Sequence, residues 1–394
     1  MIEKVPLRSN YLSLYVEGSE GLVFNHIQQC LYQIPAVSIA LLLALEQGSS
    51  REDIVHELSQ STDVPKTNLV QYVDQLEVLL SQQSTKRRYI DGRYPELSKD
   101  RLSKTYHLTS NHNTYLIANT FFAIEAKSPR LMAEITELLM PCEVASENVD
   151  VCITIEQTDS NFTIVANGID GQYLLSYKQV MPELIDCLQI LAFQHSNYQY
   201  CFHGAAIHTN KGCLLLPGTS GAGKSTLTAA LTYENNALFS DEMIVFDEKF
   251  NLTVLNLPIA VKQGSWQTLS SSYPELEMAT QWQRVDGRYL KYVWPNKFAP
   301  QNNGPKANPL FLLVNPQWQD NNLGHQDEAQ RTENVNPLTV IQTLTVLTQS
   351  GYQLGFELNE EKLEMLIQFL TSVKRFHLRY HTSAEAMSKL DVLW

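Results

Sequence analysis

One eight-residue segment constrains the fold of this chain more strongly than any other feature of its sequence. Residues 218–225 read Gly-Thr-Ser-Gly-Ala-Gly-Lys-Ser, which is the pattern G-x-x-x-x-G-K-[ST]. An apolar, strand-like run at 213–216 precedes the segment, and a helical run at 226–231 follows it. Because a phosphate-binding loop needs this order of strand, loop and helix, the segment predicts such a loop. A glycine-rich turn that binds no ligand is the alternative.

Each residue type in this segment has a chemical role. The glycines let backbone N–H groups turn inward around phosphate oxygens, and the helix that follows presents its positive end to the anion. Lys224 places a positive charge on the β- and γ-phosphates, and the Ser225 hydroxyl ligates Mg²⁺. The sequence therefore predicts ATP or GTP, bound with Mg²⁺ by Gly218, Thr219, Ser220, Gly221, Ala222, Gly223, Lys224, Ser225 and Thr226.

An acidic pair, Asp241 and Glu242, begins 17 residues after Lys224 of the loop. Residues 237–240 predict a strand that ends at Asp241 and Glu242, beyond the helix and turn that follow Lys224. A carboxylate at a strand end beside a phosphate loop can ligate Mg²⁺ or accept a proton from an attacking hydroxyl. We therefore predict that Asp241 has one or both of these roles, with a surface acidic turn as the alternative.

The composition restricts the classes of function. The 29 Lys and Arg residues against 42 Asp and Glu residues give a net charge of −13, which argues against a general nucleic-acid binder. The longest apolar run, 37–45, is shorter than the ~20 residues of a membrane span, and no signal peptide is indicated. The six cysteines lack a Cys-x-x-Cys pair and predict reduced, mostly buried thiols. We expect a multidomain cytoplasmic protein that contacts neither nucleic acid nor membrane; a homo-oligomer stays open.

Residues 1–82 predict a small winged-helix-like domain. Strand-like runs come first, at 11–16, 21–24 and 30–34. Three apolar helical patterns follow, opened by Pro35, by a capping box of Ser49 with Glu52, and by Pro65. Residues 1–80 hold ten acidic and four basic residues, and the third helix, over residues 68–80, offers no Lys or Arg to a major groove. These charges argue against DNA recognition by this domain.

A polar segment at 83–104 separates this domain from a larger one. Residues 81–104 hold seven basic and three acidic residues, which predicts a solvated linker. A basic groove for an acidic peptide, formed by Lys86, Arg87 and Arg88, is the alternative. Helical patterns at 129–140 and 179–194 then interrupt strand-like runs at 106–108, 115–118, 149–156, 162–166 and 173–177. Residues 105–394 are therefore predicted to be a mixed α/β domain with much antiparallel sheet.

The first region resembles a known family. Residues 17–60 and the Leu-rich third helix are similar to the PqqD-like domains that recognise ribosomally synthesised precursor peptides. The resemblance covers residues 10–82. It implies that the leader of a precursor peptide binds as an added strand, in a groove between the third strand and the third helix. The strand edge would be 30–34 and the helical wall 68–79.

The larger region resembles a second family. His203-Gly-Ala-Ala206, then the phosphate loop, then the acidic pair resemble, in this order, the HPr serine kinase/phosphorylase family and its divergent kinase relatives. The resemblance implies a phosphate-loop fold akin to phosphoenolpyruvate carboxykinase, and transfer of a γ-phosphate to a Ser hydroxyl. It implies that Asp241 is the catalytic base, that Glu242 replaces a second Asp, and that His203 lies near the transferred phosphate. A buried core histidine is the alternative for His203.

Two departures point to the divergent branch of that family. Thr226 stands where the family often has Glu, and residues 258–265 (Pro-Ile-Ala-Val-Lys-Gln-Gly-Ser) stand in place of a Glu-Ile-Arg-Gly-type signature. The departures argue against HPr itself as the substrate. Lys262 is a candidate to neutralise the transferred phosphate, with a surface lysine as the alternative. Arg288 and Lys291 are weaker candidates for the same role.

Together these features predict a nucleotide-dependent kinase. The first domain would capture the leader of a precursor peptide, and the second would phosphorylate a Ser or Thr hydroxyl of that peptide. One alternative is a small-molecule or HPr-type serine kinase with a regulatory N-terminal domain. Another is a nucleotide-binding scaffold that holds the peptide without phosphorylating it. The polar linker further predicts that residues 1–82 can be removed without unfolding the remainder.

Overall fold

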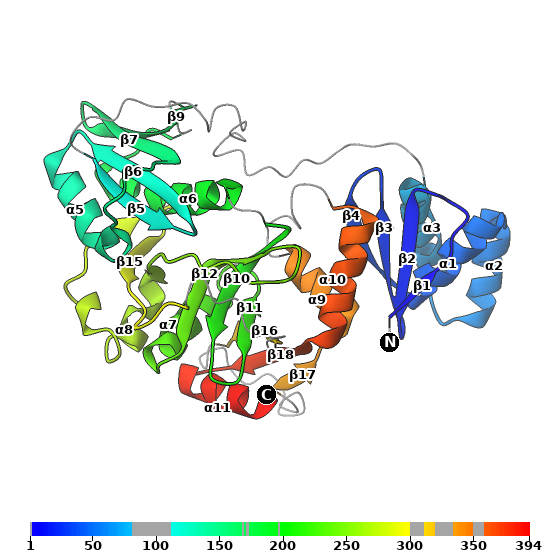
Figure 1. The fold of residues 1–394 in the computed structure, drawn as a ribbon. Coiled ribbons are helices and arrows are strands. Elements are labelled where there is room, and N and C mark those ends of the chain that lie inside the picture. The colour runs from blue at the N-terminus through cyan, green and yellow to red at the C-terminus, as the bar shows by residue number, and fades with distance from the viewer. Residues whose placement is uncertain are drawn as a thin grey trace. The chain divides into compact units, whose positions relative to one another are not determined.

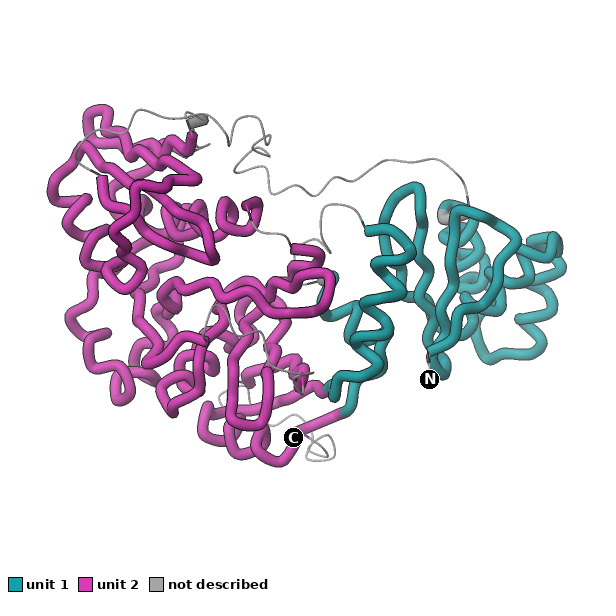
Figure 2. Tube along the Cα trace, viewed as in Figure 1, with its two compact units in different colours: residues 1–89, 337–349, 354–375 teal, residues 90–336, 350–353, 376–394 magenta. Residues whose placement is uncertain are grey.

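The protein has a mixed α+β fold, as its sequence predicts (Figure 1). The computed structural model describes residues 2–80, 112–167, 169–170, 173–195, 198–299, 311–319, 334–349 and 358–394. The predicted linker at 83–104 and the predicted strand at 106–108 lie outside these residues. The chain forms two compact units (Figure 2): unit 1 comprises residues 1–89, 337–349 and 354–375, and unit 2 comprises residues 90–336, 350–353 and 376–394.

Unit 1 begins with an antiparallel sheet that is followed by three helices. The sheet has the order β1 (Glu3–Val5), β2 (Leu12–Glu17), β3 (Glu20–Asn25), β4 (Cys30–Pro35). The helices are α1 (Ala36–Gln47), α2 (Arg51–Ser61) and α3 (Lys66–Leu80). The predicted strands and helices are confirmed, and β1 is additional. The predicted cap of α2 is wrong by one residue: Ser50, not Ser49, accepts the backbone N–H of Asp53, because α1 ends at Gly48 in a left-handed conformation.

Both faces of this sheet are buried. Leu14 and Val23 lie opposite each other in the β2–β3 pair and pack in one cluster with α1, α2 and α3. Tyr15, Leu22 and Phe24 lie on the other face, because neighbouring residues of a strand point to opposite sides, and these three are also buried. The helices α9 (Val340–Gln349) and α10 (Glu360–Ser372) cover that second face (Figure 1).

Polar contacts fix these two helices to the strands of unit 1. The Glu17 carboxylate accepts the backbone N–H groups of Val340 (2.7 Å) and Ile341 (3.2 Å) at the start of α9. This is the favourable position for a negative charge on a helix. In α10, Glu364 pairs with Lys4 at 2.7 Å. The structure therefore groups α9 and α10 with residues 1–89, which differs from the predicted domain of residues 105–394.

Unit 2 contains a five-stranded sheet with two helices. Its strands are β5 (Asn113–Ile117), β6 (Thr120–Ala126), β7 (Val151–Thr158), β8 (Asn161–Ala166) and β9 (Ile169–Asp170), in that order. The helices α5 (Pro129–Leu139) and α6 (Tyr177–His195) confirm the predicted pair. The predicted strand at 173–177 is wrong. Only Leu175 forms an isolated bridge, and Ser176 donates from its backbone and hydroxyl to Gln179 Oε1, which starts α6 instead.

A second sheet of unit 2 carries the glycine-rich segment. Its order is β12 (Ala237–Phe246), β10 (Tyr200–His208), β11 (Cys213–Pro217), β16 (Phe311–Trp318), β18 (Lys374–Tyr380), β17 (Val335–Pro337). A small sheet has the order β13 (Ile259–Lys262), β15 (Tyr289–Val293), β14 (Trp282–Gln283). The helices are α7 (Lys224–Tyr233), α8 (Trp266–Leu269) and α11 (Ser383–Leu393), with 3₁₀ turns at Met140–Cys142, Gln263–Ser265 and Pro274–Leu276.

The cysteines and the apolar helices bear on two further predictions. All six cysteines are free thiols, as expected from their irregular spacing. Burial raises the pKa of several of them, such as Cys142 to about 12, so these thiols are poor nucleophiles. Within the described residues, no helix combines the length and the apolar character that crossing a membrane requires.

Candidate nucleotide site

The glycine-rich segment forms the predicted loop between β11 and α7. The strand ends at Pro217 and the helix begins at Lys224. Gly221 and Gly223 have φ angles of 90° and 87°, a region that side chains other than glycine rarely adopt. A Cβ at Gly223 would also lie 2.3 Å from the Tyr380 hydroxyl oxygen. The glycine at this position is therefore required both by the turn and by the close approach of β18.

Two neighbouring strands support the outer side of this loop. The backbone N–H of Trp318, at the end of β16, donates to the Ala222 carbonyl oxygen at 3.2 Å. The Tyr380 hydroxyl, at the end of β18, donates to the same oxygen at 3.4 Å. The indole N–H of Trp318 in turn donates to the His381 carbonyl at 3.0 Å. These contacts hold the loop in position before any ligand arrives.

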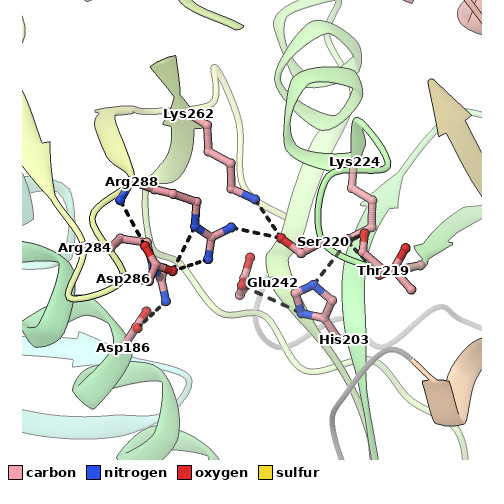
Figure 3. A network of polar contacts seen from close by, with 11 residues as sticks. Asp186, His203, Thr219, Ser220, Lys224, Glu242, Lys262, Arg284, Asp286 and Arg288 are labelled. Carbon is pink, nitrogen blue, oxygen red and sulfur yellow. Dashed lines mark hydrogen bonds and ion pairs between the residues drawn. The ribbon is translucent and has the colours of Figure 1, made fainter. Parts of the chain in front are cut away.

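The Lys224 ammonium lies inside the loop. It donates to the carbonyl oxygens of Gly218 (2.7 Å) and Thr219 (2.9 Å), and lies 3.1 Å from Nε2 of His203 (Figure 3). Burial lowers the pKa of Lys224, while the nearby carboxylates of Glu242 and Asp241 act in the opposite direction. The cation is thus held near the phosphate-binding backbone by neutral acceptors, which an anion can replace.

His203 links the lysine to the acidic pair. It lies on β10 with little solvent exposure, and its Nδ1 is 3.8 Å from Oε1 of Glu242 (Figure 3). Burial lowers the pKa of His203, and the charge of Lys224 lowers it further. An ammonium group can only donate a hydrogen bond, so Nε2 of His203 must be the acceptor for Lys224. The proton of the neutral imidazole therefore lies on Nδ1, on the side of Glu242. The structure thus brings His203 beside the loop, and it is also a buried strand histidine, so both sequence interpretations describe its position.

The acidic pair lies within a strand rather than at its end. The predicted end of the strand at Ser240 is wrong, because β12 continues to Phe246 along β10. The β10–β12 register shifts by one residue between Ala206 and Ile207, which places a bulge just before the pair. Glu242 has φ 115°, an uncommon value for a residue with a side chain, and it pairs with Gly204. Bulges and strained residues of this kind re-aim side chains next to functional sites.

The carboxyl group of Asp241 is buried, although part of the residue remains accessible to solvent. Burial, and to a smaller extent the charge of Glu242, raise the pKa of Asp241 to about 7. A hydrogen bond from the Ser225 side chain opposes the shift. Ser225 and Asp241, the two residues predicted to ligate Mg²⁺, are therefore close enough for the Ser225 side chain to influence the pKa of Asp241.

The oxygen atoms of Ser225 and Asp241 are donors of the type that Mg²⁺ prefers. In the described part of the chain, no group of three or more His, Cys, Asp or Glu side chains could hold a metal ion. This fits Mg²⁺, which is usually bound by one or two protein groups together with phosphate oxygens and water. The residues therefore suit a metal ion that arrives with a nucleotide.

Two cations approach the loop from the small sheet. Nζ of Lys262, at the end of β13, lies 3.5 Å from the Ser220 hydroxyl, and Nη1 of Arg288, before β15, lies 3.0 Å from it (Figure 3). Both were candidates from the sequence. Lys291 is not brought to the loop: its ammonium donates to the Leu276 carbonyl and lies over the Trp266 ring. Thr226 forms a hydrogen bond of 2.6 Å with the Ser265 hydroxyl.

Sequence reasoning missed three residues of this polar network. Arg284 and Asp286 lie in the β14–β15 hairpin, and Asp186 lies on α6 (Figure 3). The Asp-Gly pair at 286–287 is a local signal for a hairpin turn. Nothing local connects Asp186 to Arg284, because 98 residues separate them.

Comparison with known proteins adds no family to these observations. The chain matches no family model, and no curated protein is significantly similar to it. The two resemblances drawn from the sequence therefore stay predictions. A functional assignment must be argued from the geometry of the loop and its neighbours.

Proposed function

We propose that this protein is a nucleotide-dependent kinase that phosphorylates a Ser or Thr hydroxyl of a peptide, with ATP or GTP and Mg²⁺. The observation that carries the proposal is the position of the Lys224 ammonium inside the phosphate loop, where it donates to the Gly218 and Thr219 carbonyls and lies beside His203. Asp241, on the strand that pairs with the strand of His203, supports the presence of a base near the γ-phosphate, because the charges of Lys224 and Lys262 act on its pKa. The order of these residues also resembles that of HPr-kinase-like enzymes.

The transfer would proceed in line. A bond forms between the acceptor oxygen and the γ-phosphorus while the bond from that phosphorus to the β–γ bridging oxygen breaks. The electron pair leaves on the nucleoside diphosphate, and the proton of the hydroxyl passes to the Asp241 carboxylate. Mg²⁺, when bound, neutralises charge on the phosphates. Lys224 holds the β- and γ-phosphates, and the loop backbone fixes their orientation.

The peptide would bind at unit 1. In the described sheet β4 pairs only with β3, so its other edge is available for an added strand in the way PqqD-like domains bind leaders. A two-residue turn at Gly18 and Ser19 joins β2 to β3, so Glu17 and Glu20 form a hydrogen-bonded pair. Alternation along β3 then directs the N–H groups of Leu31 and Gln33 toward the free edge of β4. These two donors are the ones that a leader strand would use.

Radiolabelled ATP and GTP, incubated with the full-length protein and a Ser/Thr peptide library, test the proposal. Label transferred to peptides is the expected result. Nucleotide binding without any transfer would indicate a scaffold. Transfer to free serine or to HPr, but to no library peptide, would favour the small-molecule or HPr-type kinase. The presence of an aspartate at position 241, beside the strand of His203, favours an enzyme over a scaffold.

Lys224→Ala is expected to weaken nucleotide binding roughly 10- to 100-fold, because hydrogen bonds to a charged group are worth about 1.5–3 kcal/mol. Titration with a fluorescent ATP analogue measures this. Lys211→Ala is the matched control, since Lys211 is an exposed lysine that pairs with Asp391. Equal affinity of the two variants would show that the loop does not bind the phosphates.

Leu31→Pro is expected to weaken peptide binding at least ~10-fold, because proline removes one of the two backbone donors at the free edge of β4. Leu31→Ala is the control, since it also shortens the side chain but keeps the donor. The measurement is fluorescence anisotropy with a peptide selected on the wild-type protein from random 20-residue sequences. Circular dichroism checks that both variants fold. Equal affinities would place the peptide elsewhere.

A further inference from the structure

The β14–β15 hairpin delivers an arginine to the tip of the phosphate loop. Nη1 of Arg288 donates to the Ser220 hydroxyl oxygen at 3.0 Å. The other side of the same guanidinium binds Asp286, with Nε 2.9 Å from Oδ2 and Nη2 also in contact with that oxygen. The carboxylate therefore occupies two donors and leaves Nη1 directed at the loop, as Figure 3 shows.

A buried ion pair anchors this hairpin. Nη2 of Arg284 lies 2.8 Å from Oδ2 of Asp186 on α6, and Nε of Arg284 lies 3.8 Å from Oδ2 of Asp286. Only 20% of the Arg284 side chain and 14% of the Asp186 side chain are exposed. Burial alone would lower the pKa of Arg284, but Asp186, Glu242 and Asp286 outweigh it and the pKa is raised. The anchor therefore stays charged and fixes the position of Asp286.

The Ser220 hydroxyl is neutral and cannot balance the two positive charges that lie near it. Lys262 and Arg288 both approach this one neutral oxygen, at 3.5 and 3.0 Å. Among the described residues, Lys262 has this contact and no carboxylate partner. The pair of Arg288 with Asp286 is half exposed to water, so solvent screens the carboxylate and the guanidinium keeps much of its attraction for an anion. Two cations that converge on one point at the mouth of the loop suit a phosphate oxygen better than a hydroxyl.

We propose that Arg288 binds the γ-phosphate during transfer, and that Asp286 is the positioning residue that aims it. This inference rests on the proposed kinase function and deepens it. Charge spreads over the three peripheral γ-phosphate oxygens as the bond to the bridging oxygen breaks and the bond to the acceptor forms. The planar guanidinium can present Nη1 to these oxygens while Nε and Nη2 stay on Asp286, a fixed geometry that the point charge of a lysine cannot match. Arg284 and Asp186 act through Asp286 by holding the hairpin.

The proposal predicts different effects on the affinity for the product ADP and on the affinity for a mimic of the transition state. A cation used in the transfer step should favour the transition state over the bound product. The full-length protein, with Mg²⁺, is therefore titrated with fluorescent ADP alone and with fluorescent ADP plus aluminium fluoride, which imitates the transferred phosphate. Arg288→Met should weaken binding of the aluminium fluoride complex at least ~10-fold and change ADP affinity less than ~3-fold. Arg288→Lys should lie between Met and wild type.

Asp286 is tested through the ratio of the affinity for the aluminium fluoride complex to the affinity for ADP alone. Asp286→Ala should lose most of the preference for the aluminium fluoride complex, because Arg288 is then free to turn away from the loop. Asp286→Asn keeps an acceptor for the guanidinium and should regain part of it. Arg130→Met is the control, because Arg130 is an exposed arginine on α5 whose pairing is with Glu134. Its two affinities should both equal those of wild type.

The outcomes distinguish this inference from the function on which it rests. Equal losses for ADP and for the aluminium fluoride complex in Arg288→Met would make Arg288 a simple binding or structural residue. No change in either affinity would remove it from the site. Both results overturn the inference and leave the kinase function standing. A wild-type protein that binds no ADP would overturn the proposed function itself. Thermal unfolding of each variant checks its fold, and Arg288 is exposed enough for its replacement to be tolerated.

Discussion

Asp241→Asn is expected to lower phosphate transfer at least ~100-fold while nucleotide affinity stays within a few-fold of wild type. Asparagine keeps the shape of the side chain, but it cannot accept a proton, and a positioned general base contributes about 10²–10⁴-fold. Transfer of label from ATP and titration with a fluorescent nucleotide measure the two quantities. Full activity would move the base to Glu242 or His203. An equal loss of affinity would make Asp241 chiefly a metal ligand.

The same substitution should stabilise the nucleotide-free protein. The folded pKa of Asp241 is raised to about 7 from the usual 3.8, so folding favours the protonated form. The stability that this provides is complete below about pH 4 and is lost as the pH rises to about 7. Asparagine does not ionise, so the variant should exceed wild type at pH 8 by roughly 1–3 kcal/mol, with no such gain at pH 4.

Thermal unfolding at the two pH values measures this difference. Asp286→Asn is the matched control with the opposite sign, because the bonds from Arg288 lower the pKa of Asp286 and its charge therefore favours folding at neutral pH. A variant of Asp241 that unfolds at a lower temperature than wild type at pH 8 would show that the carboxylate is satisfied in the folded protein. The ionised carboxylate of Asp241 would then support phosphate transfer without lowering the stability of the folded protein.

Deletion of residues 1–82 is expected to cause aggregation rather than leave a stable protein of residues 83–394. The polar linker alone predicts a clean separation, but α9 and α10 cover one face of the unit 1 sheet. Without β2 and β3 their apolar side chains would face water, at a cost of about 1.5–3 kcal/mol for each large side chain exposed. Size-exclusion chromatography and binding of a hydrophobic dye measure the outcome.

A second deletion serves as the control for the first. It also replaces residues 339–374 with a short Gly-Ser linker, which is feasible because the ends of β17 and β18 are adjacent: the backbone N–H of Leu338 donates to the Arg375 carbonyl at 3.0 Å. This protein should be monomeric, should unfold cooperatively and should bind nucleotide like wild type. It should phosphorylate precursor peptide poorly, because the tethered leader no longer concentrates the acceptor. If the protein lacking only residues 1–82 were also monomeric and bound no more dye, α9 and α10 would not depend on the unit 1 sheet for burial of their apolar side chains.

The parts of the structure that were predictable from sequence are the local ones. The phosphate loop was identified because eight consecutive residues and their two flanking elements carry its whole signal. The helices α5 and α6 follow from periodicity alone. The limit of local information shows at β12, where the acidic pair suggested a strand end. The pairing of Gly204 with Glu242 carries the strand past that point.

The parts that were not predictable depend on contacts between distant residues. The apolar stripes of α9 and α10 indicate that each helix has a buried face, but not which sheet covers it; the contact of Glu17 with Val340 decides this. In the same way, the sequence around Arg284 indicates only a charged residue in a turn. Its partner Asp186 lies on α6, far from it in the sequence, so the ion pair is visible only in the structure. The carboxylates that orient the site are therefore harder to find than the loop that they serve.

The interrupted course of unit 1 along the chain has a consequence for synthesis on the ribosome. The strands β1 to β4 emerge first, but α9 follows roughly 300 residues later, which at ~5–20 residues per second is roughly 15–60 s. During that time Tyr15, Leu22 and Phe24 lie on a sheet face that has no cover from its own chain. The nascent protein is thus a natural client for a chaperone, and slower translation would lengthen its most aggregation-prone interval.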